Sequence, residues 1–311
     1  MMKMPMPLLG AIMIVPILSV AAYAANKPPS LGQQPLSGSL RTYVSGQGSD
    51  SNPCTATFPC ATFQAALAMT LAGGEIFVLN SADYGPVTIN KAVSITSEGA
   101  AAGVLATAGP GITINAGASD VVNLRGLTID GANYGTVGIQ FISGKSLTIQ
   151  KSFVRNFTNS GISFAPSASA TLFVSDTVVT SNANNGIVVA SATGTVKGAL
   201  LRVNASGNGV GILASGSGVS LAVTDAMVSN NGYGVAASSS AVAIRNLTAS
   251  ANSVGIAADQ SAAVVRVAQS ALTGNGTGWQ ATNGAQVQSY SNNNVGGNTS
   301  DGAATMAVAL Q

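Results

Sequence analysis

Apolar and polar residues repeat along this chain with a period of 21 to 25 residues from residue 138 onward. Each period opens with a glycine and an apolar residue, and a second apolar residue follows two positions later. The marker glycines are Gly138, Gly161, Gly186, Gly211, Gly234, Gly255 and Gly278. Residues two apart on a strand face the same side, so the two apolar positions predict a strand with one buried face. A period of this length predicts a solenoid of stacked turns.

The predicted inward columns follow from the same alternation. The first strand contributes Ile139, Ile162, Ile187, Ile212, Val235, Ile256 and Trp279, and then Phe141, Phe164, Val189, Ala214, Ala237, Ala258 and Ala281. A second strand contributes Leu124, Ile149, Val174, Gly198, Val223, Ile244 and Val267, and a third short stretch lies around Ile129, Val154, Val179, Val203 and Val228. Parallel crossovers are almost always right-handed. We therefore expect an all-β chain, a single right-handed parallel β-helix solenoid with a short N-terminal helical cap.

Asparagines recur at one predicted corner. Asn208, Asn231, Asn252 and Asn275 stand three residues before a marker glycine, whereas Asn159 and Asn184 stand two before. Asparagine tolerates left-handed backbone angles at bends, and stacked copies can hydrogen-bond in a ladder. A row of sugar-binding amides is the alternative interpretation.

The flanking segments predict export and two caps. Lys3, the apolar run from Leu8 to Val20 and Ala22-Tyr23-Ala24 have the order of a cleaved signal peptide. A membrane anchor is the alternative, but its helix needs roughly 20 apolar residues. The expected organisation is a signal peptide at 1–24, a flexible leader at 25–40, an N-terminal cap at 41–74, the β-helix at 75–300 and a C-terminal tail or cap at 301–311. No membrane span is expected in the mature chain.

The N-terminal cap combines a short helix with two cysteines. Phe63 to Leu71 has helical apolar spacing and is followed by Gly73 and Gly74. Cys54 and Cys60 are the only cysteines, and in an oxidising compartment so close a pair is expected to form a disulfide. Two independent buried thiols are the alternative.

Composition narrows the chemistry. Charged residues make up 7% of the chain, against about 25% in an average soluble domain. With 12 basic residues spread thinly, nucleic acid is not an expected partner. Histidine is absent, which removes Ser-His and Cys-His nucleophile systems and the commonest metal ligand. No cofactor or metal is expected.

Three stretches resemble a known superfamily. They are RTYVSGQGSDSNPCTATFPCATFQAAL (41–67), GGEIFVL (73–79) with YGPVTINKAVSI (84–95), and LRGLTIDG (124–131). They are similar to bacterial right-handed parallel β-helix repeat proteins of the pectin-lyase-like superfamily, over roughly residues 41–300. The resemblance implies the fold, but the superfamily contains lyases, hydrolases, tailspikes and adhesins, so it implies no single activity.

One group of charges is the candidate catalytic patch. Lys151 and Asp176 align in neighbouring turns, as do Asp130 and Arg155, four residues away on the same wall. A saccharide site is one interpretation, and two cross-strand ion pairs are the other. The calcium-binding carboxylates of the superfamily's lyases would require aspartates in one column of adjacent turns, and Asp130, Asp176 and Asp225 do not align so.

A second candidate site is an outward stripe between the two inward columns, formed by Val188, Leu213, Ala236 and Ala257. Stacked apolar residues on a wet face suggest a covered or contacting surface, and we expect a neighbouring subunit or a returning loop to cover it. The sequence therefore predicts an exported, non-catalytic β-helix that presents a binding or self-association surface, with glycan or its own copies as partner. The alternative is a polysaccharide lyase or glycoside hydrolase that acts on an acidic polysaccharide.

Overall fold

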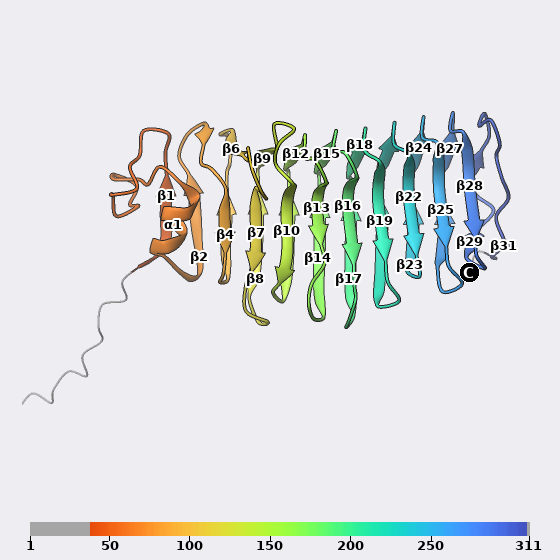
Figure 1. Cartoon of the computed structure of the whole chain (residues 1–311), viewed down its shortest axis with the longest axis horizontal. Coiled ribbons are helices and arrows are strands. Elements are labelled where there is room, and N and C mark those ends of the chain that lie inside the picture. The colour runs from red at the N-terminus through yellow and green to blue at the C-terminus, as the bar shows by residue number, and fades with distance from the viewer. Residues whose placement is uncertain (1–37, 310–311) are drawn as a thin grey trace, which may run out of the picture. The chain divides into compact units, whose positions relative to one another are not determined.

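The computed structural model describes residues 38–309, so the predicted signal peptide lies outside the described residues. The described chain winds through three parallel β-sheets, named here A, B and C, in the repeated order A, B, C (Figure 1). Each strand pairs in parallel with its copy one turn away. The all-β solenoid predicted from the sequence is confirmed.

Sheet A has 12 strands and carries the start of each turn. They are β1 (Ser39–Val44), β2 (Thr70–Val78), β5 (Val93–Thr96), β8 (Val121–Arg125), β11 (Ser146–Gln150), β14 (Ala170–Ser175), β17 (Val196–Leu201), β20 (Val219–Thr224), β23 (Ala241–Arg245), β26 (Val264–Ala268), β29 (Gln286–Ser289) and β31 (Met306–Ala307).

Sheet B has 10 short strands. They are β3 (Ala82–Asp83), β6 (Ala102–Leu105), β9 (Leu127–Asp130), β12 (Phe153–Arg155), β15 (Val178–Thr180), β18 (Asn204–Ser206), β21 (Met227–Ser229), β24 (Thr248–Ser250), β27 (Ala271–Thr273) and β30 (Asn294–Val295). Sheet C has 9 strands. They are β4 (Val87–Ile89), β7 (Ile112–Asn115), β10 (Val137–Ser143), β13 (Ser160–Phe164), β16 (Asn185–Ala190), β19 (Val210–Ser215), β22 (Tyr233–Ser238), β25 (Val254–Asp259) and β28 (Thr277–Thr282).

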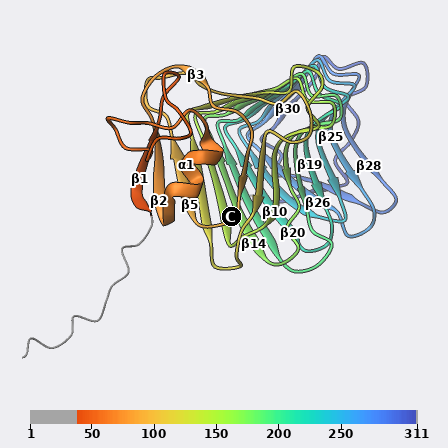
Figure 2. The ribbon, with the colours of Figure 1, turned by 60° about the vertical axis from the view of Figure 1, so that its left-hand side comes forward.

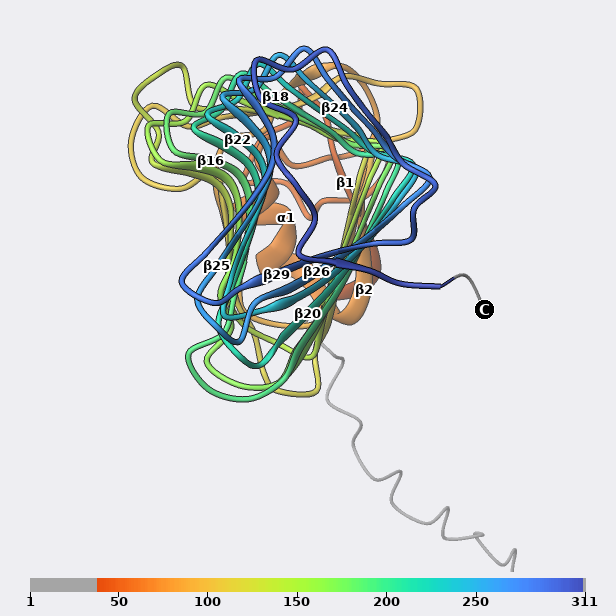
Figure 3. The same ribbon diagram turned by 90° about the vertical axis from the view of Figure 1, so that its right-hand side faces the viewer.

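The core lies between the three walls, which surround it when the solenoid is viewed end-on (Figure 3). Both inward columns predicted for sheet C pair in register, from Ile139 with Ile162 to Ile256 with Trp279. Phe141 and Phe164 stack in the core with their ring centroids 4.4 Å apart. Trp279 is buried at the end of its column, as expected for a core residue.

The inward columns of sheets A and B differ from the prediction at one turn. Val174 pairs with Leu200 rather than Gly198, and Val179 pairs with Ala205 rather than Val203. Both differences are slips of two residues, which leave the same face buried and so do not disturb the apolar alternation.

The bend from sheet A to sheet B is a single residue with positive φ in successive turns. These residues are Gly126, Lys151, Asp176, Arg202, Asp225, Asn246 and Gln269, with φ between 48° and 72°. The left-handed region is unfavourable for residues other than glycine, asparagine and aspartate, so the stacked fold holds several of these residues in a costly conformation.

The corner between sheets B and C contains the asparagine ladder. Its members are Asn182, Asn208, Asn231, Asn252, Asn275 and Asn298. Each donates from its amide side chain to Oδ1 of the next, over 2.9 to 3.2 Å, and its backbone N–H donates to the same oxygen. The predicted members Asn159 and Asn184 instead form a separate exposed pair. Because the first five ladder side chains are buried, they are not available to a sugar.

The N-terminal end is covered by a helix and a disulfide loop. Helix α1 (Phe63–Met69) packs against β1, β2 and β4, and Figure 2 shows it beside β1 and β2. Thr62 caps the helix by accepting a hydrogen bond from the Ala65 amide. The predicted helix continued to Leu71, but the backbone adopts an extended conformation from Thr70 onward. The Thr70 hydroxyl donates to the Ala66 carbonyl oxygen in the last turn of the helix. No helix among the described residues is long and apolar enough to cross a membrane.

Candidate functional site

Two residues of the candidate catalytic patch form an ion pair on the outer face of sheet B. Asp130 and Arg155 are direct partners on β9 and β12, and Arg155 Nε donates to Asp130 Oδ2 at 2.7 Å. Asp130 Oδ1 accepts hydrogen bonds from the Ala132 amide at 2.9 Å and from Asn156 Nδ2 at 3.0 Å. Burial alone would raise the pKa of Asp130, but these hydrogen bonds and the Arg155 charge outweigh it and lower the pKa below its usual value. Both carboxylate oxygens therefore already have partners.

The other two residues of the patch do not pair with each other. Lys151 and Asp176 occupy the same bend in neighbouring turns, but Asp176 is held by Arg202, whose Nε and Nη2 donate at 2.6 and 3.0 Å. The hydrogen bond from Arg202 lowers the pKa of Asp176, and the charge of Lys151 adds a smaller effect. Lys151 lies at the bend, and Arg155 lies four residues later at the end of the sheet B strand. Four residues of extended chain span ~13 Å. The four side chains thus form two separate groups.

Arg202 was missed because of the two-residue slip in β17. Once Val174 pairs with Leu200, the residue after Leu201 stands beside Asp176. The column at the bend then alternates in charge through Lys151, Asp176, Arg202 and Asp225. Alternating charges in one column are typical of cross-strand ion pairing.

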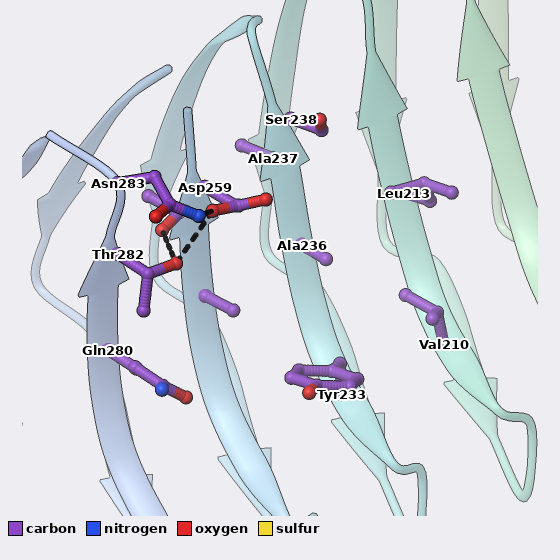
Figure 4. A pocket seen from close by; sticks show the side chains of 12 residues that line it. Val210, Leu213, Tyr233, Ala236, Ala237, Ser238, Asp259, Gln280, Thr282 and Asn283 are labelled. Atoms are coloured by element: carbon purple, nitrogen blue, oxygen red, sulfur yellow. Dashed lines mark hydrogen bonds between the residues drawn. The ribbon is translucent and has the colours of Figure 1, made fainter. Parts of the chain in front are cut away.

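The predicted outward stripe lies in a hollow on sheet C. Its residues Leu213, Ala236 and Ala257 line a groove of about 560 Å³, and Val188 continues the same row on β16. All four stripe side chains are half-buried. The groove crosses β19, β22, β25 and β28, so it runs along the stacking direction of the turns (Figure 4).

Polar groups border this apolar floor on two sides. Tyr233 lies on one side, in the row before the stripe, and its side chain is exposed. Ser238, Asp259 and Thr282 form the row on the other side, on three successive strands. Sequence reasoning missed this second row, although Asp259 stands two residues after Ala257 and alternation alone places both outward.

Asp259 is the charged residue of the groove. Thr282 Oγ1 and Asn283 Nδ2 each donate to Asp259 Oδ1 at 2.7 Å, as Figure 4 shows. Gln260 Nε2 donates to the other oxygen, Oδ2, at 3.2 Å. The hydrogen bonds from Thr282 and Asn283 lower the pKa of Asp259 below its usual value, so it is ionised at neutral pH.

Known structures share this architecture at low sequence identity. Pectate lyase Pel9A has a TM-score of 0.60 and 14% identity, over 80% of this chain and 74% of its own. This chain has the pectate lyase fold. A second structure with it, the alginate lyase from Paenibacillus sp. str. FPU-7, has a TM-score of 0.57 and 14% identity, over 86% of this chain and 98% of its own.

A third match to the pectate lyase fold is the A-module of the Azotobacter vinelandii mannuronan C-5 epimerase AlgE4. Its TM-score is 0.50 and its identity 12%, over 77% of this chain and 91% of its own. No family model and no curated protein matches the sequence. Within residues 38–309, no three histidine, cysteine, aspartate or glutamate side chains come together in a group that could hold a metal ion.

Proposed function

We propose that this protein is an exported, non-catalytic β-helix that binds a glycan along the outer face of sheet C. The observation that carries the proposal is the groove over β19, β22, β25 and β28, with its apolar floor and polar sides. A few placed polar groups around an apolar surface are typical of small-molecule and sugar sites. The disulfide between Cys54 and Cys60 supports export, because disulfides persist in oxidising compartments.

The two kinds of lining suit the two kinds of surface on a sugar ring. The C–H faces of a ring can pack on Leu213, Ala236 and Ala257, which would remove these half-buried side chains from water. Tyr233 offers an exposed ring on which a sugar can stack and a hydroxyl that can form hydrogen bonds, a combination common at binding surfaces. The hydroxyl and amide groups of Ser238 and Gln280 can then bond sugar hydroxyls.

The repeated turns suit a ligand that itself repeats. Successive strands lie ~4.8 Å apart, so the same row of side chains returns once per turn along the groove. An elongated glycan that lies along the stacking direction would meet similar contacts on each turn. Pectate lyase, alginate lyase and mannuronan epimerase, the structural neighbours, are named for polysaccharides, which supports glycan as the ligand class.

A non-catalytic role is supported by how the carboxylates are engaged. Asp130 and Asp176 are each bound by an arginine, and Asp259 is the one carboxylate among the groove residues. Two-carboxylate hydrolysis needs a second acid about 5 to 10 Å away. The alternative, a lyase or hydrolase acting on an acidic polysaccharide, is favoured by the names of the structural neighbours. Incubation with polygalacturonate and alginate, with and without Ca²⁺, tests it: we expect no unsaturated or newly reducing ends.

The binding test compares two matched lysine variants. Leu213→Lys places a charge on the groove floor, whereas Met227→Lys places one at an exposed apolar residue of sheet B. On a panel of soluble glycans, we expect Leu213→Lys to weaken binding at least about tenfold, which is about 1.4 kcal/mol, and Met227→Lys to leave it unchanged. Equal binding by both variants, or none by the unmodified protein, contradicts the proposal. If sedimentation instead shows dimers that only Leu213→Lys dissociates, a second copy is the occupant of the groove.

A further inference from the structure

The sheet C groove and a depression on sheet A are lined by residues of opposite charge. Among the twelve residues that line the sheet C groove, Asp259 alone carries a charge. On sheet A, by contrast, a smaller depression has Lys197 and Arg266 as the charged residues of its lining. Neither forms an ion pair within the described part of the chain. The groove is therefore locally acidic although the net charge of the chain is +2.

The two oxygens of Asp259 are used unequally. Oδ1 accepts two hydrogen bonds of 2.7 Å, which fix the orientation of the carboxylate. Oδ2 accepts a single longer bond, 3.2 Å from the side chain of Gln260. A carboxylate oxygen can accept about two hydrogen bonds, so Oδ2 keeps capacity for a donor from outside.

We infer that the groove selects a glycan bearing a protonated amino group, whose N–H donates a hydrogen bond to Asp259 Oδ2. The groove disfavours glycans that carry carboxylates. The inference rests on the proposed function and narrows its ligand class. An ammonium group brings both a donor and a positive charge to Oδ2, and charge-assisted hydrogen bonds are stronger than neutral ones. A uronate carboxylate in the same place brings neither and is repelled by Asp259.

The ligand class thus differs from that in the names of the structural neighbours. Pectate, alginate and mannuronan are acidic polymers, and no lysine or arginine that would attract such a polymer is among the residues that line the groove. The position of Asp259 between Ser238 and the Thr282–Asn283 pair sets where the amino group must stand, at the edge of the apolar floor (Figure 4).

The test measures the affinity of the full mature protein for three hexamers: glucosamine, N-acetylglucosamine and galacturonate. Calorimetry at about pH 5.5 keeps the amine protonated and Asp259 ionised. For a partly exposed charge pair we expect the glucosamine hexamer to bind about fivefold more tightly than its N-acetyl counterpart. This preference should shrink when salt rises from about 20 mM to about 300 mM, because salt screens the pair.

Two isosteric variants separate the roles of individual carboxylates. Asp259→Asn keeps the shape of the side chain, and its amide oxygen can still accept from Thr282 and Asn283, so the variant should fold normally. It should bind the glucosamine and N-acetylglucosamine hexamers equally. Asp225→Asn removes a carboxylate at the bend between sheets A and B, outside the groove, and should keep the preference.

Each other outcome has a defined meaning. Equal affinity of the unmodified protein for the two glucosamine hexamers, or tightest binding of galacturonate, overturns the inference and leaves the proposed function standing. A preference that survives in Asp259→Asn also overturns it. Absence of binding to all three hexamers counts against the proposed function itself.

Discussion

At the scale of single residues, the corner asparagines do more than tolerate a bend. Asn231 accepts from the backbone N–H and the side chain of Asn208, and it donates to Asn252 Oδ1 and to the Ala205 carbonyl oxygen. Every polar atom of this buried side chain therefore has a partner. Removing one such group leaves several buried donors and acceptors unpaired, and each unpaired group costs about 1 to 3 kcal/mol.

We predict that Asn231→Ala lowers the free energy of unfolding by about 3 kcal/mol, because Asn208 and Ala205 lose their partners in the core. Denaturant unfolding followed by circular dichroism measures the change. Asn184→Ala is the control: its side chain is exposed and bonds only the exposed Asn159, so a loss below about 0.5 kcal/mol is expected. Similar losses in the two variants would show that the ladder contributes no special stability.

The sequence predicted most of this ladder but not its first rung. Asn208, Asn231, Asn252 and Asn275 share one spacing from the marker glycines, whereas Asn182 stands four residues before Gly186. The spacing between an asparagine and its marker glycine counts residues along the chain. A corner that is one residue longer changes this count but leaves the asparagine at the same place in the stacked turns. Asp259 was missed for another reason, since an isolated charge on an outward row gives no periodic signal.

At the scale of strands, the difference between prediction and structure lies in register. Alternation assigns the buried face reliably, because a slip of one residue would turn every apolar side chain outward. A slip of two keeps the face, so Gly198 and Leu200 were equally acceptable partners for Val174. Arg202, and with it the Asp176 ion pair, could be placed only after the pairing was known.

The outer edge of β1 illustrates how an end strand is protected. The Tyr43 backbone N–H donates to the Cys54 carbonyl oxygen at 2.9 Å, and the Tyr43 carbonyl oxygen accepts from the Cys60 amide at 3.0 Å. The Ser45 backbone N–H donates to the Cys60 carbonyl oxygen at 3.0 Å. The Cys54–Cys60 disulfide closes this loop, so it holds a short segment against the edge. Covered edges do not pair with strands of other molecules.

We predict that replacing both cysteines by serine lowers the free energy of unfolding by about 2 kcal/mol, as expected for so short a closed loop. The Tyr43 and Ser45 amides should lose protection in hydrogen exchange before the rest of sheet A does. Intact mass with and without reductant verifies the bridge in the starting protein. Two thiols that alkylate without reductant would refute the disulfide, and unchanged exchange at Tyr43 would refute its role at the edge.

At the scale of the whole solenoid, each turn contacts mainly its two neighbours, so turns act as nearly equivalent units. The pairing of Asn204 with Met227, of Val210 with Tyr233 and of Val196 with Val219 is offset by the same 23 residues in all three sheets. Repetition of this kind is why the fold could be predicted from periodicity alone, while a site that depends on one residue in one turn could not.

We predict that deleting residues 204–226 yields a folded protein one turn shorter. Val203 then joins Met227, the register partner of Asn204, and Asn182 can donate to Asn231 in place of Asn208. Circular dichroism should keep its strand signal with cooperative unfolding, and the solenoid should shorten by ~4.8 Å. Deleting only residues 204–215 breaks the register and should abolish folding; if both deletions behave alike, the turns are not interchangeable.

The ladder also has a direction. Every rung donates toward the C-terminal neighbour, from the Phe157 backbone N–H, which donates to Asn182 Oδ1, to Asn298, whose side chain donates to Asp301 Oδ1 at 2.9 Å. Aligned amides add their dipoles as the peptides of a helix do, and a carboxylate stands at the end where the unpaired donors would collect. The two ends of the ladder are therefore electrically different. Both ends of the ladder are closed within the chain, because the Phe157 N–H fills the first asparagine oxygen and Asp301 accepts from the last asparagine amide, so the ladder leaves no open end for a second copy to continue.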